Sequence, residues 1–130
     1  MRCYTIALFG QTERGQYRVA HYCNDLAQLV ETFGHPPPET TGLYLAIQAL
    51  LYNRAIIFFR VEEEGFSVDD YLLGLNYLKG QDKKQRIAAI GLPGVGDREI
   101  IEASTPICTE HKSLLVFTEA DLYDYLTAEK

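Results

Sequence analysis

Two glycine-containing segments have the composition of loops that bind small anions. The first runs from Gly10 to Gly15 and includes Thr12 and Arg14. Its GxxxxG spacing is that of a phosphate-binding P-loop, but Gln16-Tyr17 stands where Lys and then Ser or Thr must follow. The backbone amides, the Thr12 hydroxyl and the Arg14 guanidinium still offer donors to a small anion. The alternative is a polar connection between two strands.

The second segment runs from Gly91 through Gly94 to Gly96 and precedes Asp97. Its glycines permit close backbone approach to a ligand, and the amino terminus of a following helix attracts anions. The order GxxGxG differs from the GxGxxG dinucleotide fingerprint. Asp97 is also a natural helix N-cap that would accept from the same amides. A structural loop is therefore the alternative interpretation.

Other reactive side chains are sparse. The acidic run Glu62–Glu64 follows an apolar segment, where carboxylates can hold Mg²⁺, but such a run is more typical of a solvated turn. Cys108 precedes His111 by three positions, so thiol chemistry at Cys108 is a third and weaker hypothesis. Neither a GxSxG elbow nor a CxxC pair is present. We predict no catalytic residues, no metal and no cofactor.

The elements that would position these residues follow from hydrophobic periodicity. Strands are expected at 5–9, 55–61, 86–90 and 113–117, and the segment 16–22 is either a further strand or irregular. Helices are expected at 25–33, 40–52, 67–80 and 97–101 and from 118 onward, and 81–85 is expected to be a solvated loop. Asn24 or Asp25, Ser67, Asp97 and Thr118 are the expected N-caps of four of these helices. Strands that alternate with helices are typical of a parallel sheet with helices on both faces. We predict one α/β domain over 1–130, a small three-layer Rossmann-like fold with a mostly parallel sheet of four to five strands.

Composition and charge exclude several classes of partner. With 12 Lys and Arg against 18 Asp and Glu, the net charge of −6 leaves no basic face for nucleic acid or anionic membrane. No apolar run approaches the ~18–20 residues of a membrane span. The three cysteines, Cys3, Cys23 and Cys108, are an odd number, as in proteins with reduced thiols. We expect a cytoplasmic protein.

Nine tyrosines in 130 residues favour a role in protein association. Several lie on expected helices, and the helix at 40–52 is apolar on nearly every face, as in helices buried in a domain or covered by another subunit. Tyrosine is enriched at interfaces. Tyr44, Tyr52 and Tyr71 are the predicted interface residues. We predict a non-catalytic protein that acts by self-association, as a homo-oligomer, or by binding a protein partner. The alternative is a protein that binds a small anionic ligand or nucleotide at the two glycine loops, either as an enzyme or as a binding protein.

Overall fold

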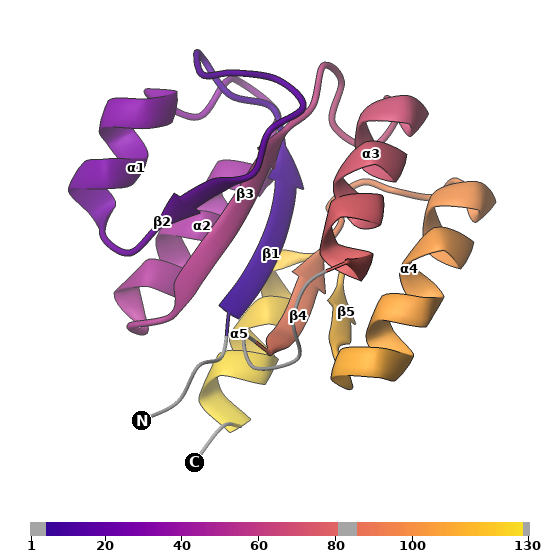
Figure 1. The fold of residues 1–130 in the computed structure, drawn as a ribbon. Helices are drawn as coiled ribbons and strands as arrows, with labels where there is room; N and C mark the ends of the chain where they lie inside the picture. The colour runs from indigo at the N-terminus through magenta and orange to yellow at the C-terminus, as the bar shows by residue number, and fades with distance from the viewer. Residues whose placement is uncertain (1–4, 81–85, 129–130) are drawn as a thin grey trace.

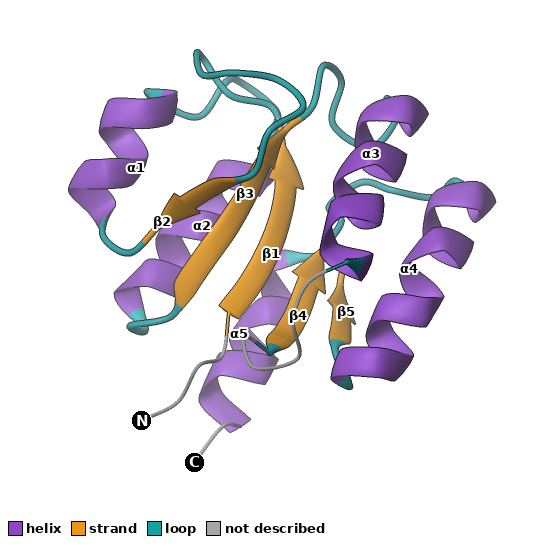
Figure 2. Ribbon diagram, in the orientation of Figure 1, coloured by secondary structure: helices purple, strands orange, loops and turns teal. Residues whose placement is uncertain are grey.

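A central sheet lies between two layers of helices in the computed structural model, which describes residues 5–80 and 86–128 (Figure 1). The helices α1, α2 and α5 pack on one face of the sheet, and α3 and α4 pack on the other (Figure 2). The predicted fold class, a small α/β fold with a mostly parallel sheet, is confirmed. The loop predicted at 81–85 lies outside the described residues.

Strands and helices alternate along most of the chain, as the periodicity predicts. Their bounds in chain order are β1 Thr5–Gly10, β2 His21–Cys23, α1 Leu26–Phe33, α2 Gly42–Leu51, β3 Ala55–Arg60, α3 Val68–Lys79, β4 Ile87–Gly91, α4 Arg98–His111, β5 Leu114–Val116 and α5 Glu119–Ala128.

The five strands of the described residues lie in the order β2-β3-β1-β4-β5. Four of them are parallel, and the short edge strand β2 runs antiparallel to β3. From β1 in the middle of the sheet, the described chain continues through the edge strand β2 to β3 on one side of β1 and then crosses to β4 on the other side. In open α/β sheets, ligands bind at the carboxyl ends of the strands where the winding reverses in this way. Here that point lies beyond Gly10.

Side chains of the central strands alternate between two apolar cores. Ile6 and Leu8 of β1 point toward α1, α2 and α5, whereas Ala7 and Phe9 point toward α3 and α4. All six residues of β1 are buried. A strand that is covered on both faces needs apolar residues at consecutive positions, which is why this segment reads as a continuous apolar run.

Capping residues set three helix starts as predicted. The Asp25 carboxylate accepts from the amide three residues ahead at 2.8 Å, and the Asp97 carboxylate accepts from the second and third amides after it. The Thr118 hydroxyl likewise accepts from the amide three residues ahead at 3.1 Å. Ser67 differs, because its side chain makes no cap hydrogen bond to α3 and instead bonds the backbone of Glu63.

The segment 16–22 is mostly irregular, the second of its two interpretations: only His21 and Tyr22 lie in β2, because Arg18 adopts a φ of 64° that interrupts the extended backbone. One predicted helix has the wrong extent. The helix expected to end near Ile101 continues to His111 and contains Pro106. It continues because Ile100, Ser104, Ile107 and His111 form one buried face at helical spacing. None of the described helices is long and apolar enough to cross a membrane.

Candidate functional site

The carboxylate of Glu64, in the loop after β3, accepts hydrogen bonds from the backbone amides at the amino terminus of α2. Oε2 accepts from the Thr41 amide at 2.6 Å, and Oε1 accepts from the amides of Gln11 at 3.0 Å and Gly42 at 3.2 Å. The side-chain oxygen of Gln11 accepts in turn from the Glu64 amide at 2.8 Å. The first amides of a helix have no partner inside it and favour negative charge. The Glu64 carboxylate thus takes the place that an anionic ligand would take here.

The interpretation of Glu62–Glu64 as a solvated turn is therefore wrong for Glu64. Its role was missed because its partners, Gln11 and Thr41, lie 53 and 23 residues away in the chain. No local pattern around Glu64 could have identified them.

Glycines allow the loops at this edge of the sheet to pack backbone against backbone. A Cβ on Gly42 would lie 2.7 Å from the Cα of Gly10 and 2.9 Å from the carbonyl oxygen of Phe9. Gly65 has a φ of +91°, and a Cβ there would lie 2.6 Å from the carbonyl oxygen of Gly94. The loops after β3 and β4 thus meet near the end of β1, where an open α/β fold leaves a ligand crevice.

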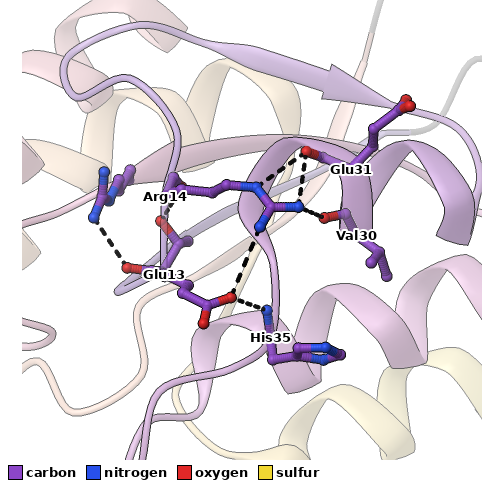
Figure 3. Close-up of polar contacts among 7 residues, drawn as sticks. Glu13, Arg14, Val30, Glu31 and His35 are labelled. Atoms are coloured by element: carbon purple, nitrogen blue, oxygen red, sulfur yellow. Dashed lines mark hydrogen bonds and ion pairs between the residues drawn. The ribbon is translucent and has the colours of Figure 1, made fainter.

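Arg14 is engaged by the carboxyl end of α1 (Figure 3). Its Nη2 donates to the Val30 carbonyl at 3.0 Å, and its Nε donates to the Glu31 carbonyl at 3.3 Å. Glu13 lies 4.0 Å from the guanidinium and also accepts from the His35 amide at 3.0 Å. A cation at the end of a helix compensates carbonyls that have no partner within it. The contacts of Arg14 are therefore those of a helix cap.

Thr12 and Gly15 hold the same loop against Arg60 at the end of β3. The Thr12 hydroxyl donates to the Arg14 carbonyl at 2.7 Å. The guanidinium of Arg60 donates to the carbonyls of Gly15 at 2.6 Å and Thr12 at 3.1 Å, and it lies 4.2 Å from the ring centre of Tyr17. The loop thus presents carbonyl groups to an internal cation at these two residues.

The glycines of the second predicted anion-binding loop also lie in different surroundings. Gly91 lies within β4, paired with Leu8, and Gly94 packs on Gly65. The space around Gly96 is open, but Asp97 already accepts from the first amides of α4. Thr12, Arg14, Gly15, Gly91 and Gly94 thus each contact a different internal partner. Their function as a ligand site stays a prediction.

Cys108 and His111 have surroundings that disfavour thiol catalysis. Burial raises the pKa of the Cys108 thiol, so less of the reactive thiolate is present at neutral pH. His111 is 3% exposed, and its Nδ1 accepts from the Ile87 amide at 3.3 Å. That bond ties the imidazole to β4. The pKa of Cys23 is raised as well, first by burial and then by the negative charge of Asp25.

An apolar groove lies between α2 and α5. It has a volume of about 500 Å³ and is lined by Tyr44, Ile47, Gln48, Leu51, Glu119, Ala120 and Tyr123; we call it the α2–α5 groove. Leu51 is 65% exposed, Tyr123 51% and Tyr44 48%. A second hollow of about 530 Å³ lies between α5 and β5, lined in part by Asp121, Asp124 and Tyr125.

The two faces of α2 explain why the sequence identified only part of this surface. Leu43, Ala46 and Leu50 pack into the core, while Tyr44, Ile47 and Leu51 form a second apolar stripe at the spacing i, i+3 and i+7. That second stripe was the available signal for Ile47 and Leu51. The contribution of α5 depends on tertiary packing alone.

The three predicted interface tyrosines lie in different environments. Tyr44 lines the α2–α5 groove, and Tyr52 follows α2 with 40% of its surface exposed. The prediction for Tyr71 is wrong, because this residue is 0% exposed in the core and its hydroxyl accepts from the Gly65 amide at 2.6 Å. The same burial raises the pKa of the Tyr71 phenol well above its usual value.

Within residues 5–80 and 86–128, no group of three or more His, Cys, Asp or Glu side chains is arranged to hold a metal ion. The chain matches no protein-family model, and comparisons with curated proteins and with solved structures find no significant match. The functional argument therefore rests on the chain's own geometry.

Proposed function

We propose that this protein is non-catalytic and acts by protein association through the α2–α5 groove. The apolar stripe formed by the exposed side chains of Tyr44 and Leu51 and the partly buried Ile47 carries the proposal. Single exposed apolar residues are common on protein surfaces, but a contiguous apolar surface with polar groups at its rim is typical of interaction sites. Tyr123 of α5 extends the same surface, and Tyr44 and Tyr123 combine apolar area with a hydroxyl that can bind a partner.

The alternative function, binding of a small anion at Gly10–Gly15 and Gly91–Gly96, has less support. The amides at the amino terminus of α2 donate to Glu64, and the Arg14 guanidinium donates to the carboxyl end of α1. An anionic ligand would have to displace these internal partners. Association through the groove requires no such rearrangement.

The proposal is tested with Leu51→Ser, because Leu51 is the most exposed apolar side chain in the groove. Burial of its remaining surface by a partner contributes about 1–2 kcal/mol, so the variant should weaken association about tenfold. Phe66→Ser is the matched control, since Phe66 is 68% exposed and lies outside the groove.

Sedimentation velocity measures self-association, and quantitative affinity capture measures retention of other proteins. We expect at least one of these associations to be weakened by Leu51→Ser and preserved in Phe66→Ser. Equal behaviour of both variants and the unmodified protein in the two assays would contradict the proposal.

A further inference from the structure

The acceptor at the amino terminus of α2 comes from another part of the chain. Thr41 occupies the N-cap position, but its side chain makes no cap hydrogen bond. The carboxylate of Glu64, 23 residues beyond Thr41, accepts from the first amides instead. An ordinary N-cap is supplied by the residue that precedes its own helix. Glu64 therefore enters a set of donors that other segments form.

These donors belong to two elements and hold both oxygens of the carboxylate. Oε1 of Glu64 accepts from the amides of Gln11 at 3.0 Å and Gly42 at 3.2 Å. Oε2 accepts from Thr41 at 2.6 Å and lies 3.3 Å from the nitrogen of Gly42. Gln11 follows the fully buried β1, and α2 packs into the core. The packing of these two elements fixes the amides independently of the Glu64 side chain.

Glycines at the ends of the same two elements leave the space in which this oxygen lies. A Cβ on Gly10 would lie 2.8 Å from Oε1 of Glu64, and a Cβ on Gly42 would lie 3.0 Å from it. Both distances are shorter than an ordinary van der Waals contact, so a side chain at either position would displace the oxygen or the backbone. Gly10, Gln11, Thr41 and Gly42 thus form a cradle for one carboxylate, which we call the Glu64 cradle.

The Glu64 cradle lies where a sheet of this topology offers its ligand site. It is at the carboxyl end of β1, the central strand, where the winding of the sheet reverses. The amino terminus of α2 favours negative charge at the same place. Glu64 is only partly buried, so solvent reaches this edge of the sheet.

We infer that the Glu64 cradle is a binding site for a small carboxylate, which Glu64 closes from within the chain as an autoinhibitory contact. The backbone amide of Glu64 donates to the side-chain oxygen of Gln11 at 2.8 Å and so holds the residue beside the cradle. A group tethered next to its site has a high effective concentration, and a free carboxylate therefore competes poorly with it. This site is separate from the α2–α5 groove, so the inference and the proposed function are tested independently.

The test uses Glu64→Ala, which removes Cγ and the carboxylate, the atoms that acetate replaces one for one. The probes are sodium acetate and sodium pivalate at equal concentration and pH. Pivalate carries the same charge, but its tert-butyl group is too bulky for the space that Glu64→Ala opens. Urea denaturation measures stability, and ¹H–¹⁵N correlation spectra follow the amides of Gln11, Thr41 and Gly42. Glu63→Ala is the matched control for the general effect of each salt.

Acetate at about 0.5 M should raise the folding equilibrium constant of Glu64→Ala at least about fivefold over pivalate, as a dissociation constant of about 100 mM predicts. The amide resonances of Gln11, Thr41 and Gly42 should shift with acetate and saturate. Neither change is expected in the unmodified protein, because Glu64 occupies the cradle there. Glu64→Gln still fills the cradle with its side chain and should respond less to acetate than Glu64→Ala.

Two kinds of result overturn the inference. Equal effects of acetate and pivalate on Glu64→Ala, an acetate effect of the same size in Glu63→Ala, or a Glu64→Ala protein that stays unfolded in acetate each exclude a carboxylate site. Equal shifts of the cradle amides in the unmodified protein and in Glu64→Ala would show that the cradle is open, and they would exclude the autoinhibitory contact.

Discussion

Replacing Glu64 with alanine removes the acceptor shared by three backbone amides at the carboxyl edge of the sheet. Gln11 follows β1, and Thr41 and Gly42 begin α2, so one carboxylate joins the end of the central strand to the start of a largely buried helix. Loss of this carboxylate leaves amides of α2 without a protein acceptor and removes the charge that compensates the helix dipole.

The expected cost follows from the geometry. The bonds are 3.0, 2.6 and 3.2 Å long and partly buried, so water can replace some of what is lost. Hydrogen bonds to charged groups contribute ~1.5–3 kcal/mol each when protected and less where solvent has access. We therefore expect Glu64→Ala to lower the free energy of unfolding by about 2–4 kcal/mol. Glu64→Gln, which keeps one acceptor oxygen and no charge, should lie between Glu64→Ala and the unmodified protein.

Urea denaturation followed by far-ultraviolet circular dichroism measures these differences. A shift of the transition midpoint reports a change in stability when the m value, the slope of the unfolding free energy against urea concentration, is unchanged. Glu63→Ala is the control, because Glu63 is exposed and adjacent in sequence, and it should change stability by no more than about 0.5 kcal/mol. A Glu64→Ala protein no less stable than Glu63→Ala would refute the assignment of Glu64 as the cap of α2.

Two further predictions concern close packing and alkaline pH. Gly42→Ala should destabilise the fold by about 1–3 kcal/mol in the same assay, because its Cβ would meet backbone atoms of Gly10 at 2.7 Å, whereas Gly96→Ala meets nothing within 4 Å and should be nearly neutral. A Gly42→Ala protein of unchanged stability would contradict the close approach. Burial, and then the hydrogen bond with Tyr77, raises the pKa of Tyr22 from 10.0 to about 12, so its contribution to stability is complete below pH 10 and is lost as pH rises through 12. Between pH 10 and 12, the urea midpoint of Tyr22→Phe should therefore fall less than that of the unmodified protein. An equal fall in the two proteins would show that Tyr22 does not cause the loss of stability at alkaline pH.

The anionic-ligand prediction shows how far local patterns reach toward a site. Gly10, Thr12 and Arg14 have residue types that commonly bind anions; Gly10 ends the buried strand β1, and Thr12 and Arg14 follow it as predicted. Two of the nearby donors are nevertheless bonded to distant segments: the Arg14 guanidinium donates to α1, and the Gln11 amide that follows Gly10 donates to Glu64. The sequence shows which groups can donate hydrogen bonds. Only the fold determines which acceptor lies within hydrogen-bonding distance of each donor.

The α/β architecture and most helix starts could be predicted from the sequence by itself. Apolar runs such as Thr5–Phe9 and caps such as Asp25 and Asp97 act over one or two turns, so the sequence displays them directly. The high apolar content of α2 could also be predicted from the sequence. Its division into a core face and an exposed face could not.

Tertiary structure alone decided the order of the strands, the burial of Tyr71, the cap that Glu64 supplies to α2 and the pairing of α2 with α5. These features depend on contacts between segments tens of residues apart. A tyrosine or a glutamate has the same local pattern whether it lies in the core, caps a helix or faces water. Its role follows from what the rest of the chain packs against it.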